Sequence, residues 1–263
     1  MRHEKTLIGL IAFFFIFWFG IPLIAPQTAG IIYTVTLPVR HLGVFVHEMG
    51  HGLFTLLSGG NFHWFQMELM KGGVAITSGG FRVVTILGGL LGPALLGALL
   101  LYLSTKAANV RPVLIGLTLL FALGVYYMVK PLFLGNHAHP YLTQWSAFHL
   151  LSASIPAAMI WVTLAIMRGS ENVQRFFLQI MGILMCYSGY SDTSYIFHYE
   201  PLSNGLYSDA RVLASTFWTS VETVPFPLFV VTASVISVLN LGLMAWGTYA
   251  ALKRSPRRSF EGT

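Results

Sequence analysis

The chain has 263 residues, of which 55% are hydrophobic and only 9% are charged, and its mean hydropathy is +0.70. A soluble domain has roughly a quarter of its residues charged, so this composition excludes an ordinary soluble protein and predicts a chain embedded in lipid. The formal net charge is +6, and basic residues gather near both ends of the sequence. A short basic tail after an apolar helix favours contact with anionic lipid headgroups, so we expect no nucleic-acid partner.

Seven apolar stretches approach or exceed the length needed to cross a bilayer core of roughly 30 Å. They cover residues 7–25, 31–57, 82–104, 112–133, 146–167, 174–191 and 226–252. The segments between them are too short for a separate soluble domain. We therefore predict an all-α polytopic membrane protein with six or seven transmembrane helices, forming a single integral membrane domain over residues 1–263.

The basic residues at the two ends predict how the chain lies in its membrane. By the positive-inside tendency, both termini belong in the cytoplasm. Seven spans would place them on opposite sides, so we expect one stretch to be re-entrant or two to form a broken helix. The first apolar stretch is too long for the usual cleaved signal peptide, and we expect it to be a retained anchor helix. The predicted location is a multi-pass integral membrane protein, which in a bacterium would lie in the plasma (inner) membrane.

A glycine-bounded segment separates the second and third spans. Residues 58–80 contain two β-prone runs, beginning near Phe62 and near Gly73, with glycines at both ends. This pattern predicts a small β-hairpin or sheet between these spans. An exposed edge of such a sheet can receive an unwound peptide by strand addition, although the segment can equally be an ordinary connection.

The pentapeptide His47-Glu48-Met49-Gly50-His51 has the pattern H-E-x-x-H and lies within the apolar stretch 31–57. On a helix, positions four apart differ by about 400° of rotation and about 6 Å of rise, so His47 and His51 stack on one face and can share a metal ion. Glu48 sits about 100° round from His47, where it can take a proton from metal-bound water. Ionisable side chains are costly inside a bilayer, so three within five positions favour a metal site over histidines that only satisfy buried hydrogen bonds.

A catalytic zinc ion usually takes three protein ligands and leaves one position for water. A carboxylate is the expected third donor, and the chain contains only two aspartates, Asp192 and Asp209. Asp192 closes an apolar stretch, where a helix end can hold it at membrane depth, so we favour it as the ligand. Asp209 is the second choice, because it follows in a more polar segment and is expected near the surface. Glu68 and His63 are further alternatives, and either aspartate can instead cap a helix together with the serine before it.

Small residues also mark the neighbourhood of the motif. Gly50 and Gly52 flank His51 and are expected to leave space around the metal. The third span carries Gly88, Gly89, Gly92, Pro93 and Gly97, a spacing that permits close helix approach. The single cysteine, Cys186, excludes an intrachain disulfide, and its apolar surroundings argue against a reactive thiol.

Together these features resemble the site-2 protease family of zinc intramembrane metalloproteases. The resemblance rests on His47 to His51 in the membrane, on the glycine-rich segment 59–80, and on Gly92-Pro93 through Gly97 in the next span. The nearest match is the short branch without PDZ domains, in which an aspartate after an apolar helix is followed by a Ser-Asp-Ala element. Here these are Asp192 and Ser208-Asp209-Ala210. Better-studied members carry the third ligand in a Leu-Asp-Gly sequence, which this chain lacks, so Asp192 is assigned by position.

The resemblance implies a zinc-dependent metalloendopeptidase with its core over about residues 31–215. Zn²⁺ would be held by His47, His51 and Asp192, and Glu48 would be the general base that activates water for attack on a peptide bond. The partners implied are membrane lipid and a transmembrane peptide or protein substrate, cleaved in or near its transmembrane segment. The alternative is a non-proteolytic membrane scaffold or transporter that retains the metal site. A transporter would be favoured by two inverted halves, which we do not detect in the sequence.

Overall fold

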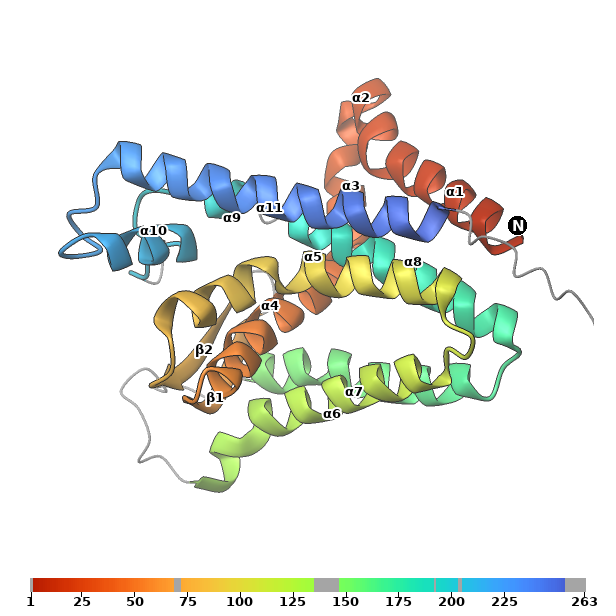
Figure 1. Ribbon diagram of the computed structural model, residues 1–263, viewed down its shortest axis with the longest axis horizontal. Coiled ribbons are helices and arrows are strands. Elements are labelled where there is room, and N and C mark those ends of the chain that lie inside the picture. The colour runs from red at the N-terminus through yellow and green to blue at the C-terminus, as the bar shows by residue number, and fades with distance from the viewer. Residues whose placement is uncertain (1, 69–71, 135–146, 192, 203–204, 254–263) are drawn as a thin grey trace, which may run out of the picture.

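The computed structural model describes residues 2–68, 72–134, 147–191, 193–202 and 205–253, and most of them are helical (Figure 1). The elements follow the predicted apolar stretches closely. Their bounds are α1 (Arg2–Phe15), η1 (Ile16–Gly20), α2 (Ile21–Ile24), η2 (Pro26–Thr28), α3 (Ala29–Val35), α4 (Leu37–Leu57), β1 (Asn61–Glu68), β2 (Gly72–Ser78), α5 (Arg82–Lys106), α6 (Arg111–Leu134), α7 (Ala147–Met167), α8 (Glu171–Ser191), α9 (Thr193–Ile196), α10 (Asp209–Ala214), η3 (Ser215–Phe217) and α11 (Phe226–Leu252).

Helix α5 lies at the centre of the bundle, between α4, α8 and α11 (Figure 1). Its small residues make this position possible. A Cβ added at Gly88 would lie 2.7 Å from the carbonyl oxygen of Gly50 on α4, and one added at Gly97 would lie 2.8 Å from that of Gly182 on α8. A Cβ added at Gly247 on α11 would meet Ala98 at 2.5 Å. The predicted close packing of the third span is therefore confirmed, and it extends to three neighbours.

The predicted hairpin is also confirmed. Strands β1 and β2 form a two-stranded antiparallel sheet, with a register shift between Phe62 and Trp64 that marks a β-bulge. Both strands pack against α4, and the sheet lies at the end of that helix (Figure 1). Gly79 and Gly80 connect β2 to α5 with φ of +69° and +70°, a conformation that glycine adopts without strain. The sheet is thereby fixed between α4, which carries the H-E-x-x-H motif, and α5, which follows the sheet in the chain.

Helices α6 and α7 form a separate layer below α5 and α8 in Figure 1. They pack on each other and on β1, and Phe121 of α6 meets Phe45 of α4 at a ring-centroid distance of 5.6 Å. His41 of α4 also faces this layer, because its Nε2 lies 3.3 Å from the carbonyl oxygen of Ser152 on α7.

The polar segment after α8 folds back onto the apolar bundle through α9 and α10. Arg211 makes this possible, since its buried guanidinium donates to the carbonyl oxygens of Tyr199, Val221 and Glu222 at 2.5–2.8 Å. The rings of Tyr199 and Tyr207 lie on it at 4.1 and 4.2 Å from their centroids. With each guanidinium nitrogen donating to a carbonyl oxygen and the charge held against two aromatic faces, this cation can be buried.

Within the described residues, four helices are long and apolar enough to cross a membrane, or five if the bent pair Pro26–Ile32 and Leu37–Leu57 is one span. The predicted count of six or seven is therefore not confirmed. The 59° bend in that pair agrees with the expected broken or re-entrant segment. Pro38, in the first turn of α4, suits a helix start at this break because its missing N–H would have no partner there.

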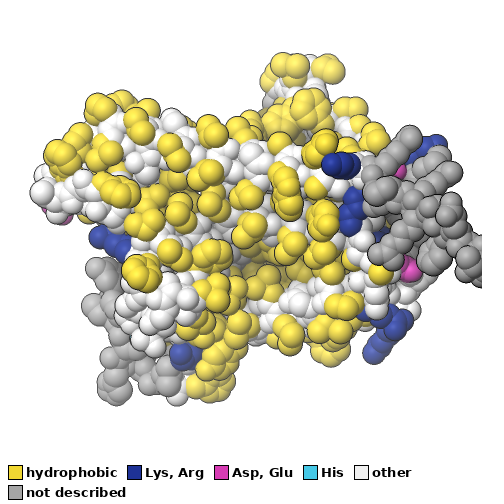
Figure 2. Space-filling model, in the orientation of Figure 1, with side chains coloured by type: hydrophobic (Ala, Val, Ile, Leu, Met, Phe, Trp, Pro, Cys, Tyr) yellow, Lys and Arg dark blue, Asp and Glu magenta, His cyan; other side chains and the backbone are white. Residues whose placement is uncertain are grey.

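The surface is that of an integral membrane protein. Hydrophobic side chains cover much of the face in Figure 2, while lysine and arginine side chains lie toward the ends of the long axis. Many large apolar side chains are exposed, among them Leu23 and Phe133 at 83% each. A soluble monomer rarely exposes contiguous apolar surface of this extent. Leu7 of α1 and Ala251 of α11 belong to the same buried cluster. The beginning of α1 and the end of α11 therefore lie at the same end of the bundle, as the predicted placement of both termini on one side requires.

Candidate metal centre

The two histidines of the motif point the same way from α4. His47 and His51 are both buried, and their Nε2 atoms are 3.1 Å apart. Their rings meet edge to face, with centroids 4.8 Å apart and planes at 80°. The helical spacing thus produces the shared face predicted from the sequence.

Thr85 on α5 fixes the orientation of His51. Its carbonyl oxygen lies 2.9 Å from His51 Nδ1 and can only accept, so Nδ1 carries a proton, and in the neutral ring Nε2 is the nitrogen whose lone pair is available to a metal. Thr55 is fully buried and donates to the His51 carbonyl oxygen at 2.8 Å, so the Thr85 hydroxyl donates to Thr55 across their 2.8 Å contact. This arrangement is the usual support of a metal-binding histidine, with one ring nitrogen on a carbonyl and the other free for the metal.

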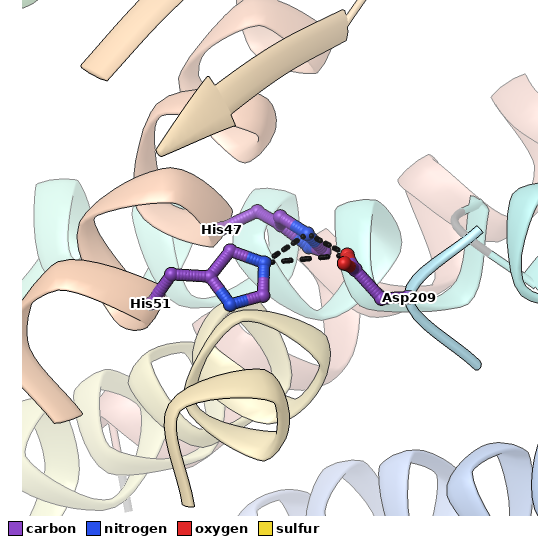
Figure 3. Close-up of side chains that lie close together, drawn as sticks. All are labelled: His47, His51 and Asp209. Atoms are coloured by element: carbon purple, nitrogen blue, oxygen red, sulfur yellow. Dashed lines mark hydrogen bonds and ion pairs between the residues drawn. The ribbon is translucent and has the colours of Figure 1, made fainter. Parts of the chain in front are cut away.

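The third group comes from the first residue of α10. Oδ2 of Asp209 lies 2.9 Å from His47 Nε2 and 3.2 Å from His51 Nε2 (Figure 3). The three side chains meet from two elements far apart in sequence. Within the described part of the chain, His47, His51 and Asp209 are the group of His, Cys, Asp and Glu residues that could hold a metal ion.

The donor set fits zinc. Two imidazole nitrogens and a carboxylate oxygen are ligands that Zn²⁺ takes at about 2.0–2.2 Å, so the ligand atoms of a tetrahedral site lie roughly 3.3 Å apart. The three atoms here are separated by 2.9–3.2 Å. His51 Nε2 and the Asp209 carboxylate face one another at 3.2 Å, so a cation between them could be bound by the lone pair of the neutral imidazole and by the carboxylate together.

The charge of Asp209 agrees with this role. In the metal-free protein, burial by itself raises the pKa of the carboxyl group, but protonated imidazoles of His51 and His47 beside it more than offset that effect and hold the pKa below its usual range. Asp209 is therefore ionised and ready to act as a ligand at neutral pH.

Glu48 lies beside this group and against the sheet. It is buried, and it is close enough to His47, His51 and Asp209 to interact with all three electrostatically. Its carboxyl group makes a hydrogen bond with the backbone of Ala75 in β2. A Cβ added at Gly73 would lie 2.7 Å from Glu48 Oε1, so a glycine in β2 provides the space that the carboxylate occupies.

The glycines of the motif have a different function from the one expected. A Cβ at Gly50 would lie 2.2 Å from the carbonyl oxygen of Gly88, and a Cβ at Gly52 would lie 2.2 Å from the ring of Phe62. These glycines make room for α5 and β1 rather than for a metal. The glycine that borders the site is Gly89, whose added Cβ would lie 2.2 Å from His51 Nε2.

We expect Gly89→Ala to displace the His51 ring and to lower zinc affinity by about 10- to 100-fold, the usual cost of disturbing the support of a metal ligand. Competition with a chromophoric chelator measures the change. Gly92→Ala is the matched control, because its Cβ would meet α4 no closer than 3.4 Å, an ordinary contact. Equal zinc affinity in the two variants would mean that the space at Gly89 does not position His51.

The structure revises part of the sequence interpretation. Asp192, the favoured third ligand, lies outside the described residues, and so does the side chain of Glu68. Asp209 was expected near the surface, but its side chain is only 20% exposed and touches both histidines, so that expectation is wrong. Ser208 holds the N-cap position of α10 without capping it, because its hydroxyl donates to the His198 carbonyl oxygen instead. His63 pairs with the Ser78 hydroxyl at 2.7 Å on the exposed part of the sheet.

Sequence reasoning missed the residues that support the ligands. Thr85 is an ordinary residue in the first turn of α5, and nothing local distinguishes it. Arg211, two residues after Asp209, could have indicated that this segment is packed, since a cation so close to a candidate ligand needs a partner. The Ser-Asp-Ala element was the one local indication that Asp209 mattered.

One of the three comparisons with known proteins finds a match. A family model described as Peptidase M50B-like matches residues 7–247. The chain belongs to the site-2 protease family. No curated protein and no solved structure matches it. Peptidases of this family are zinc-dependent, and the matched range includes the whole candidate centre, from His47 to Asp209.

Proposed function

We propose that this protein is an intramembrane zinc metalloprotease that hydrolyses peptide bonds in or near transmembrane segments of membrane-protein substrates. The observation that carries the proposal is the convergence of His47, His51 and Asp209 beside the buried Glu48, within a bundle of apolar helices. Ionisable groups inside a membrane protein are costly and mark a functional site. Membership of a peptidase family supports a hydrolytic role for that site.

In this proposal His47, His51 and Asp209 hold the zinc ion. Asp209 replaces Asp192 as the proposed third ligand, because its carboxylate lies 2.9 and 3.2 Å from the two imidazoles. When bound, zinc would supply Lewis acidity, polarising a peptide carbonyl and making water a nucleophile at neutral pH. His51 is held by Thr85 in the tautomer that this role needs.

Glu48 is the proposed general base. Its carboxylate would accept a proton from the attacking water and pass it to the amine of the departing peptide segment. The hydrogen bond to Ala75 and the lack of a side chain at Gly73 hold the carboxyl group between α4 and β2. Its burial keeps bulk water away, so the proton moves between the reacting groups.

Strand β2 is the proposed docking edge for the substrate. In an antiparallel pair, each residue directs its backbone N–H and C=O either toward the partner strand or away from it. The Ala75 backbone bonds with Glu48, so at Ala75 these groups belong to the edge that β1 does not cover. An unwound segment of a transmembrane substrate added at this edge would pass directly beside Glu48.

Chelation provides the first test. Protein reconstituted in liposomes with a quenched-fluorescent transmembrane peptide should cleave it, lose the activity after treatment with 1,10-phenanthroline, and regain it with Zn²⁺ but not with Mg²⁺. The preference for zinc follows from the two imidazole ligands. Cleavage that persists in protein shown to be metal-free would contradict the proposed function.

A further inference from the structure

Tyr195 on α9 contacts the candidate centre but is not one of the three proposed ligands. Its hydroxyl lies 3.2 Å from the backbone nitrogen of Asp209 and 3.3 Å from Asp209 Oδ2. Its ring meets the ring of His47 nearly at right angles, with centroids 6.2 Å apart and planes at 82°. One side chain therefore touches two of the three proposed ligands.

The two hydrogen bonds of the hydroxyl have a defined direction. The Asp209 N–H is a donor, so the Tyr195 oxygen accepts it, and the hydroxyl proton is then free to be donated to the carboxylate. The hydroxyl thereby accepts one of the N–H groups at the start of α10 that have no acceptor within the helix. Ser208 stands at the N-cap position but bonds elsewhere, and the first N–H groups of a helix need acceptors from outside it.

This arrangement restrains Asp209 at two points. Its backbone and its carboxylate are bonded to the same oxygen atom, which limits the rotation of the side chain about χ1 and χ2. The carboxylate oxygen that Tyr195 contacts is also the one that meets both imidazoles. Without the hydroxyl, Asp209 would keep its place in the chain but lose the bond that aims it.

We infer that Tyr195 is a positioning residue of the metal centre, whose hydroxyl orients the Asp209 carboxylate toward His47 and His51. This inference rests on the proposed zinc site. It adds a residue that the H-E-x-x-H pattern does not contain and that acts through a ligand rather than on the substrate.

The test is Tyr195→Phe, which keeps the ring and removes only the hydroxyl. Zinc affinity, measured by chelator competition, should fall by about 10- to 100-fold, as for other groups that orient metal ligands. The visible spectrum of the Co²⁺-substituted protein should also change, because it reports ligand geometry. Tyr199→Phe is the matched control: its hydroxyl donates to the Val224 carbonyl oxygen at 2.7 Å in the same segment and touches no proposed ligand. That variant should keep wild-type zinc affinity and cobalt spectrum.

The outcomes separate the two proposals. Wild-type protein that binds no zinc would overturn the proposed function and this inference together. Wild-type zinc affinity and an unchanged cobalt spectrum in Tyr195→Phe would overturn the inference alone. An equal loss of affinity in Tyr195→Phe and Tyr199→Phe, with melting temperatures lowered to the same extent, would assign Tyr195 a merely structural role and would also overturn it.

Discussion

Glu48→Gln is expected to reduce cleavage of a transmembrane substrate by about 10²- to 10⁴-fold while leaving the zinc content unchanged. General acid–base catalysis contributes rate enhancements of this order, and the amide of glutamine cannot accept the proton. The substitution preserves size, so it fits the space that Gly73 leaves beside the side chain. Cleavage rates in liposomes and zinc per chain by elemental analysis, on the same preparations, measure the two quantities.

The matched control is Glu171→Gln at the start of α8. Glu171 pairs with Arg175 at 2.6 Å, and its side chain is 60% exposed. It has no part in the proposed metal centre. This variant should cleave at the wild-type rate. A Glu48→Gln protein that keeps its biological activity would instead favour the alternative of a non-proteolytic scaffold or transporter that has retained the metal site.

Asp209→Ala is expected to lose zinc almost completely, whereas Asp192→Ala should retain about one zinc ion per chain. Removing Asp209 leaves two imidazoles to hold the ion, and a catalytic zinc site needs three protein ligands. Cleavage should disappear with the metal. Elemental analysis of both variants, purified in parallel with His47→Ala, gives the zinc content directly.

This pair of substitutions also tests the choice between the two aspartates. Retained zinc in Asp209→Ala together with lost zinc in Asp192→Ala would return the third ligand to the position that the sequence favoured. A second variant, Asp209→Asn, tests whether the alanine variant loses zinc only because it misfolds, since asparagine keeps the shape of the side chain. It should fold as the wild type does and still bind zinc poorly, because a neutral amide oxygen is a weaker ligand than a carboxylate.

Local pattern was sufficient for the parts of this protein whose geometry is set within a few residues. The apolar stretches predicted the positions of the long helices, and glycine-bounded β-prone runs predicted β1 and β2. The four-residue spacing of His47 and His51 predicted their shared face, because the pitch of a helix allows no other arrangement. Glycines at one-turn spacing predicted that α5 would pack closely.

The third proposed ligand and its support were decided by tertiary structure alone. Asp209 lies 158 and 162 residues from the histidines that it meets, and its polar neighbours predicted a surface position. Those neighbours could be packed against the bundle because Arg211 is satisfied by three carbonyl groups and two aromatic rings, contacts that exist only in the folded chain. Gly50 and Gly52 were likewise misjudged, since their function depends on Gly88 and Phe62 from other elements. The sequence by itself determined which helix carries the histidines and which face they share. Only the folding of a distant segment decided which carboxylate completes the group, because long-range packing leaves no period in the sequence from which to predict it.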